Sequence, residues 1–268
     1  MAGFFERRRK RAAWLVAGAV VSLTGGACAG AATSPATEPQ RLIVEVRRIL
    51  AHDTDSFTQG LVIAGGELYE SRGHYGESSV RRLDRLTGRV LAERPLAPEL
   101  FAEGLAAVGE SLVQLTWKEG VAIVWDRATL TETGRYGYTG LGWGLCSDGR
   151  RLYQSDGSEV LVVRHPRSFA ARGRLSVTLE GQPVRQLNEL ECAEGWIYAN
   201  LLGSDTIARI DPHSGRVTAL IDASGLLTPS ERQQADVLNG IAYDDEAGVF
   251  LLTGKYWPKM FEVVFRAP

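Results

Sequence analysis

The sequence predicts an all-β protein, a five-bladed β-propeller in which each blade is a four-stranded antiparallel sheet. The main observation is a pattern that occurs five times, in which a polar or aromatic residue precedes a Leu or Ile by two positions and a short apolar strand follows. The five stretches cover residues 57–71, 101–115, 142–157, 187–201 and 238–254. Aligned on Leu61, Leu105, Leu145, Leu190 and Ile241, they lie 44, 40, 45 and 51 residues apart. Repeats of about 40–50 residues with several short strands each are typical of propellers.

Each repeat continues with further strands. A turn containing Gly or Asp leads to a second strand, at residues 67–73, 111–117, 151–157, 196–202 and 249–255. A third strand alternates apolar and polar residues, as half-buried antiparallel strands do. It ends in a D-x-x-[ST] turn at Asp84, Asp126 and Asp211, and His165 replaces the Asp in another repeat. An Asp in such a turn accepts hydrogen bonds from nearby backbone N–H groups. A fourth strand, such as 89–96, then completes the blade.

The two ends of the domain complement each other. The last repeat stops after its third strand, residues 261–266, while the strand-like segment 41–50 precedes the first repeat. We therefore expect 41–50 to pair with 261–266 as the missing fourth strand, which closes the ring and removes two exposed sheet edges. One segment is not strand-like: Thr228-Pro229-Ser230-Glu231 reads as a capping box, so a short helix should run to about Asp236.

The first 30 residues read as an export signal. Five basic residues (7–11) precede an apolar run (12–26) and small residues around Cys28, the order of a secretory signal peptide. Cleavage near Ala29 or Ala31 is one outcome. A lipid on Cys28, as in bacterial lipoproteins, is the other, although Gly25 stands where such proteins carry Leu. Residues 31–40 read as a flexible tether, and 41–268 as the propeller domain, exported to the periplasm or secreted.

Composition excludes several functions. The net charge of −2 includes the basic N-terminal segment, so the mature domain is distinctly acidic, which argues against a nucleic-acid partner. The four histidines are scattered without zinc-ligand spacing, and phosphate-loop and nucleophile-elbow motifs are missing. We therefore expect no metal and no cofactor, a monomer, and membrane association only through a lipid on Cys28.

The two remaining cysteines of the domain, Cys146 and Cys192, are one repeat apart and should occupy near-equivalent positions of adjacent blades. A disulfide is one possibility. Because blades diverge outward and each cysteine lies in an apolar strand, the expectation is two buried free thiols.

The repeat alignment also predicts a site. The residues two positions before each anchor become equivalent and form a ring at one end of the central axis: Gln59, Glu103, Trp143, Asn188 and Asn239. Glu103 is the one carboxylate in this ring, and Phe101 lies two residues before it. A carboxylate walled by aromatic rings is partly desolvated, which raises its pKa and suits it to proton transfer.

Each of these residues also has an ordinary structural interpretation. Glu103 could be a salt-bridged surface residue, and Gln59 and Asn188 could satisfy backbone groups near the axis. The aromatic side chains of Phe57, Trp117, Trp143 and Trp257 could be blade packing, and Lys255 could be a solvated surface lysine. Their common position at one end of the strands favours a pocket instead.

At these residues the chain resembles a known family. The motifs FTQGL (57–61), F-x-EGL (101–105), GWGL (142–145), SDG (155–157), RQLNELE (185–191), DVLNGIAYD (236–244) and TGKYWPKMFEV (253–263) are similar to those of plant- and bacterial-type glutaminyl-peptide cyclotransferases. The likeness covers about residues 42–265. It implies a five-bladed propeller that acts without a catalytic metal as an acyltransferase, converting the N-terminal glutamine of peptides or proteins to pyroglutamate with release of ammonia.

The resemblance also implies roles for individual residues. The family's acid/base glutamate falls on Glu103, and its pocket residues fall on Phe57, Gln59, Phe101, Trp117, Trp143, Asn188 and Lys255. One position departs from the family, because Leu202 stands where a second pocket tryptophan is expected.

The implied reaction is intramolecular. The α-amine attacks the side-chain carbonyl of its own residue, and one carboxylate can take the proton from the amine and give it to the departing nitrogen. Lys255, Gln59 and Asn188 are candidates for stabilising the oxyanion. Two other classes remain: an exported propeller that binds a peptide or glycan without catalysis, and a calcium-dependent propeller lactonase. The ring, with its single carboxylate, is a poor cage for calcium.

Overall fold

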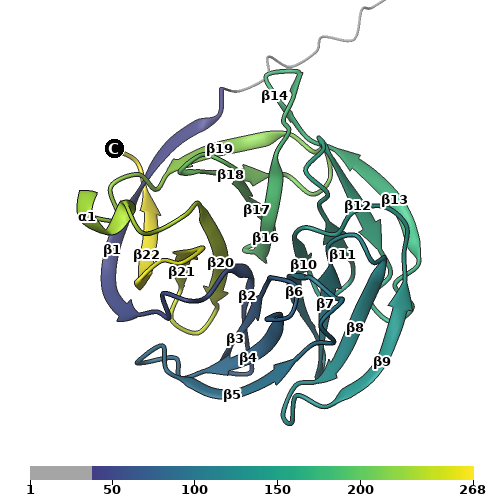
Figure 1. The fold of residues 1–268 in the computed structure, drawn as a ribbon. Coiled ribbons are helices and arrows are strands. Elements are labelled where there is room, and N and C mark those ends of the chain that lie inside the picture. The colour runs from purple at the N-terminus through teal and green to yellow at the C-terminus, as the bar shows by residue number, and fades with distance from the viewer. Residues whose placement is uncertain (1–37) are drawn as a thin grey trace, which may run out of the picture. The chain divides into compact units, whose positions relative to one another are not determined.

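The computed structural model describes residues 38–268, which fold into β-sheets with one short helix (Figure 1). Three sheets have four antiparallel strands each, in chain order. The first contains β2 (Thr58–Ala64), β3 (Glu67–Arg72), β4 (Ser79–Leu83) and β5 (Val90–Pro95). The second contains β6 (Ala102–Val108), β7 (Ser111–Thr116), β8 (Val121–Asp126) and β9 (Glu132–Gly137). The third contains β10 (Leu145–Ser147), β11 (Leu152–Gln154), β12 (Val160–Arg164) and β13 (Ala171–Ser176).

The remaining large sheet has eight strands. One half contains β16 (Leu187–Ala193), β17 (Trp196–Leu201), β18 (Thr206–Ile210) and β19 (Val217–Asp222). The other contains β20 (Leu238–Asp244), β21 (Val249–Gly254), β22 (Lys259–Arg266) and β1 (Gln40–Ala51). A small hairpin of β14 (Thr178–Leu179) and β15 (Gln182–Pro183) stands apart. The structure thus contains the predicted all-β fold of four-stranded antiparallel units, and two of these units are joined into the eight-stranded sheet.

Strand β1 makes this join. It pairs antiparallel with β22 from Ile43 opposite Arg266 to Ala51 opposite Lys259. Its first residues, Gln40–Ile43, also pair in parallel with β19. The sequence predicts the first pairing but not the second. The second pairing forms because β1 extends beyond the end of β22 and there meets the outer edge of the neighbouring unit.

Five first strands lie nearest the centre in Figure 1: β2, β6, β10, β16 and β20. Each contacts the next along the chain, and β20 contacts β2. The turns between third and fourth strands form as the sequence predicts. The Asp84 carboxylate accepts hydrogen bonds from the Thr87 amide and hydroxyl, both 2.8 Å long. In the repeat that lacks the Asp, His165 Nδ1 accepts from the Ser168 amide at 3.3 Å.

Helix α1 (Pro229–Arg232) begins with the predicted capping box, in which Thr228 and Glu231 exchange side-chain and backbone hydrogen bonds. It ends four residues earlier than the sequence predicts, before Asp236. No helix among residues 38–268 is long and apolar enough to cross a membrane. The predicted signal segment, including Cys28, and most of the predicted tether lie outside the described residues.

Close packing at the centre depends on glycine. Gly60, Gly104, Gly144 and Gly240 each follow a ring residue, and a Cβ added to Gly104 would lie 2.5 Å from the backbone nitrogen of Leu145. The fourth repeat has Glu189 at this position. Its fully buried carboxylate accepts hydrogen bonds from the Leu61 amide at 3.2 Å and the Ile241 amide at 2.9 Å. This side chain therefore ties three first strands together.

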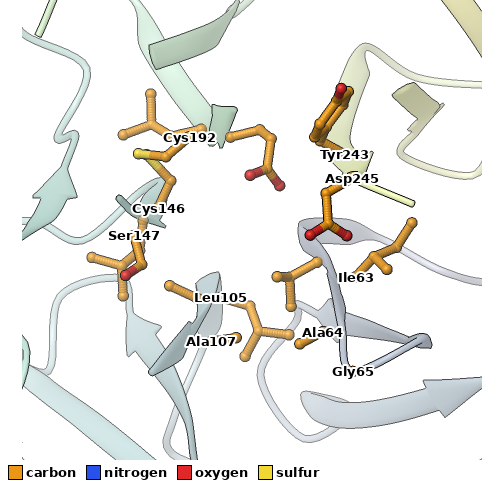
Figure 2. A pocket seen from close by; sticks show the side chains of 15 residues that line it. Ile63, Ala64, Gly65, Leu105, Ala107, Cys146, Ser147, Cys192, Tyr243 and Asp245 are labelled. Atoms are coloured by element: carbon orange, nitrogen blue, oxygen red, sulfur yellow. A yellow bond between two sulfur atoms is a disulfide. The ribbon is translucent and has the colours of Figure 1, made fainter. Parts of the chain in front are cut away.

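The expectation of free thiols is wrong. Cys146 on β10 and Cys192 on β16 form a disulfide, with their Cα atoms 5.4 Å apart. Blades do diverge outward, but these two strands are the innermost ones, where neighbouring backbones are within disulfide reach. Figure 2 shows both cysteines on the wall of a cavity of about 280 Å³.

Replacing both cysteines with serine is expected to lower the free energy of unfolding by about 2–4 kcal/mol, since the crosslink closes a loop of 46 residues in the unfolded chain. The midpoint of thermal unfolding should fall by about 5–15 °C. Heating the wild type with a reductant should reproduce this shift, and the same reductant should leave the double variant unchanged. Equal midpoints for wild type and variant would contradict the prediction.

Candidate active site

A pocket of about 300 Å³ lies where the first strands begin. Ten residues line it: Phe57, Gln59, His74, Phe101, Glu103, Trp117, Trp143, Asn188, Leu202 and Lys255. The structure thus brings together all eight site residues named from the sequence, which come from five different repeats. The cavity of Figure 2 is lined by later residues of the same strands, such as Ala107 and Cys192, and so lies at their other end.

Glu103 is the buried acid of this pocket, with 4% of its surface exposed. Gln59 Nε2 donates a hydrogen bond of 3.0 Å to Glu103 Oε1. Asn239 orients that amide, because its Nδ2 donates to Gln59 Oε1 at 3.3 Å and to the Thr58 carbonyl at 2.8 Å. Asn239, the fifth ring residue, therefore supports Gln59 from behind and does not line the pocket. Among residues 38–268, Glu103 Oε2 accepts no hydrogen bond, which leaves it available to a ligand.

Burial raises the pKa of Glu103 well above its ordinary value; the positive charge of Lys255 opposes this effect and the negative charge of Glu119 adds to it. Lys255 itself is 6% exposed, and its Nζ lies 4.4 Å from the centre of the Phe57 ring. Burial lowers the pKa of Lys255, while the charges of Glu103 and Asp236 act against that shift. The pocket therefore holds an acid and a base whose pKa values move toward each other.

Aromatic rings form a continuous part of the wall. Phe101 lies between Phe57 and Trp117, with ring centres 6.2 and 5.6 Å apart. Trp143 rests on the bare face of Gly157, where an added Cβ would come within 2.6 Å of the indole. The glycine of the SDG motif thus makes room for a pocket ring. Trp257, another candidate aromatic, lies instead in the core, and its Nε1 donates to the Asp236 carbonyl at 2.9 Å.

One residue of the wall was missed from the sequence. His74 lines the pocket, and its Nε2 is hydrogen-bonded at 2.7 Å to the hydroxyl of Tyr256. Both residues have a positive φ, 103° for His74 and 59° for Tyr256, which aims loop side chains in directions that strand patterns do not reveal. The ring of Phe57 lies close to both, with centres 4.3 and 5.3 Å away. In the part of the chain that the structure describes, no three His, Cys, Asp or Glu side chains are grouped to hold a metal ion.

Comparison with known proteins shows which family the chain belongs to. The model of the glutamine cyclotransferase family matches residues 19–265, and the chain belongs to that family. It is 39% identical over 228 residues to a glutaminyl-peptide cyclotransferase of Arabidopsis thaliana, covering 83% of this chain and 71% of that protein. The resemblance inferred from the motifs is thereby confirmed.

Solved structures give the same picture. The crystal structure of Myxococcus xanthus glutaminyl cyclase superimposes with a TM-score of 0.79 and 41% identity, over 86% of this chain and all of that one. A streptogramin B lyase structure superimposes with a TM-score of 0.51 over 84% of this chain and 98% of that one. At 10% identity, that second likeness concerns the fold alone.

Proposed function

We propose that this protein cyclises the N-terminal glutamine of peptides or proteins to pyroglutamate, with Glu103 as its single acid/base group and no metal ion. One observation carries the proposal: a buried carboxylate with a free oxygen and a raised pKa lies in an aromatic pocket of about 300 Å³. That volume suits one glutamine side chain, and the rings can fold the flexible chain toward attack.

The chemistry follows from the free oxygen of Glu103. The α-nitrogen of the substrate forms a bond to the δ-carbon of its own side chain, and the bond from that carbon to the amide nitrogen breaks. Glu103 Oε2 accepts the proton that the attacking amine loses and delivers it to the departing nitrogen, which leaves as ammonia. Gln59 donates to Oε1 throughout and so keeps Oε2 pointed at the reacting atoms.

The oxyanion requires a donor of its own. Gln59 Nε2 already donates to Glu103, so it is the weakest of the three candidates from the sequence. The Asn188 side chain lines the pocket and forms no hydrogen bond with residues 38–268, and Lys255 brings a positive charge into the same pocket, where it lowers the pKa of Glu103. We therefore assign oxyanion stabilisation to Asn188 and Lys255.

We also infer a five-bladed propeller. The five first strands contact one another in cyclic order, and each begins a group of four strands. Strand β1, the first strand of residues 38–268, lies beside β22, the last of them, which supports its assignment as the fourth strand of the final blade. The disulfide supports export, because such bonds persist in oxidising compartments.

The direct test is incubation of the mature domain with a peptide that begins with glutamine, in the presence of EDTA. Ammonia should appear together with a peptide lighter by one ammonia molecule. A peptide that binds without changing mass would instead favour the non-catalytic binding protein. Activity that EDTA abolishes and calcium or zinc restores would contradict the metal-free mechanism.

The rate should depend on pH through Glu103. The carboxyl accepts a proton only when ionised, so kcat/KM should rise with pH through the pKa of Glu103, which burial raises above the ordinary glutamate range. Lys255 holds that pKa down, so Lys255→Met should raise it and move the acid limb to higher pH. The acid limbs of the kcat/KM profiles of wild type and Lys255→Met are measured with the same peptide, so that titration of the substrate affects both equally. An unmoved limb, or one moved to lower pH, would contradict the assignment.

A further inference from the structure

A third cavity, of about 320 Å³, lies next to the pocket between the fourth and fifth repeats. It is lined by residues 203–205, Arg232 and residues 235–237, and we call this cavity the outer groove. On one side the chain passes directly from Leu202 in the pocket to Gly203 in the groove. On the other, the backbone of Lys255 is hydrogen-bonded to Val237 at 3.0 Å and to Asp236 at 2.8 Å. On both sides, residues that line the pocket are therefore direct neighbours of residues that line the groove, although no residue lines both.

The substrate chain has to leave the pocket somewhere, and the wall is uneven. On one side the rings of Phe57, Phe101 and Trp117 form a row in which each ring contacts the next. On the side of the groove the wall is formed by aliphatic and polar side chains, those of Asn188, Leu202 and Lys255. The peptide backbone beyond the glutamine carries polar groups that need partners. Among residues 38–268, the Gly203 N–H and the Ala235 carbonyl of the groove form no hydrogen bond and can supply them.

The groove carries an excess negative charge. Asp205 is neutralised by Arg232, with 2.5 Å between carboxylate oxygen and guanidinium nitrogen, and the Arg232 guanidinium also lies 5.6 Å from the Trp257 ring centre. In the described part of the chain, Asp236 forms no ion pair, and its Oδ1 accepts a hydrogen bond of 2.8 Å from the Val237 amide. Its side chain is exposed to solvent and so is open to an incoming cation.

We propose that the outer groove binds the residue that follows the N-terminal glutamine and that Asp236 makes the enzyme prefer a basic side chain there. This proposal rests on the cyclase function, since it concerns the chain attached to the reacting residue. The preference arises from one solvent-exposed carboxylate, so it should be modest and should weaken as salt screens the charge.

The experiment compares two peptides, Gln-Lys-Gly-Gly and Gln-Glu-Gly-Gly, by kcat/KM at low ionic strength. The wild type should favour the lysine peptide by about threefold to tenfold, and 0.5 M salt (roughly a 4 Å screening length) should reduce the ratio toward one. Asp236→Asn, which retains an oxygen for the Val237 amide, should bring the ratio close to one at low salt. Arg232→Gln should raise the ratio above the wild-type value, because it leaves the Asp205 carboxylate without its counter-charge.

Asp245→Asn is the matched control. It removes the same charge from the cavity at the other end of the first strands, labelled in Figure 2, and should leave the ratio at the wild-type value. Each ratio compares peptides with the same reacting glutamine, so changes inside the pocket cancel. Equal rates for both peptides, or a ratio that Asp236→Asn does not change, would overturn the groove assignment. Failure of the wild type to cyclise either peptide would overturn the proposed function instead.

Discussion

Replacing Glu103 with glutamine is expected to lower kcat by about 10²–10⁴-fold while KM changes little. The amide keeps the size of the side chain, but it has no carboxylate oxygen to accept a proton. The interaction lost is therefore one made in the transition state. Steady-state kinetics with a glutamine-initiated peptide provides the measurement, and circular dichroism checks that the variant is folded.

The control is Glu110→Gln, which makes the same change at an exposed position whose carboxylate pairs with Arg127. It should have wild-type activity. Replacing Trp143 or Gln59 should act differently, by weakening binding or by slowing turnover through poorer positioning. A folded Glu103→Gln protein that cyclises at the normal rate would disprove the mechanism, and an unfolded one would show that Glu103 is structural.

Gly104→Ala is expected to cost about 3 kcal/mol of stability, at the upper end for overpacking, because the obstacles are backbone atoms. The added Cβ would lie 2.5 Å from the Leu145 nitrogen and 2.6 Å from the Trp143 carbonyl oxygen. Neither can move without displacing the neighbouring first strand, and Glu103 and Trp143 would shift with it. Activity should therefore fall together with stability, as measured by urea denaturation.

Gly134→Ala makes the same change on the outer strand β9, where an added Cβ meets no atom within 4 Å. Removing a glycine from the unfolded chain usually stabilises by about 0.4–1 kcal/mol at an unstrained position, so this variant should be at least as stable as wild type. If both variants unfold at the same urea concentration, close approach of the first strands does not depend on Gly104.

The repeat was enough to predict the units of four strands and the residues that meet at the pocket. Once five stretches are equivalent, Gln59, Glu103 and Asn188 must lie near one another although up to 129 residues separate them. The parallel pairing of β1 with β19 could not be predicted in this way, because it breaks the repeat. His74 was missed for a related reason: a loop with φ of 103° directs it, and strand periodicity carries no information about that angle. The disulfide could not be predicted because it depends on the distance between two neighbouring first strands, and the spacing of the cysteines in the sequence does not determine that distance.

The buried carboxylate of Glu189 has a kinetic consequence. It bridges the Leu61 and Ile241 amides at the centre, and the pocket and the cavity at the other end share no lining residue. In the described part of the chain, the Glu189 contacts therefore separate the pocket of Glu103 from that cavity. For a cyclase, we expect the pyroglutamyl peptide to leave through the same mouth by which the substrate enters. The finished peptide therefore occupies the same space as the next substrate and should inhibit competitively, so that the rate falls as product accumulates at high conversion.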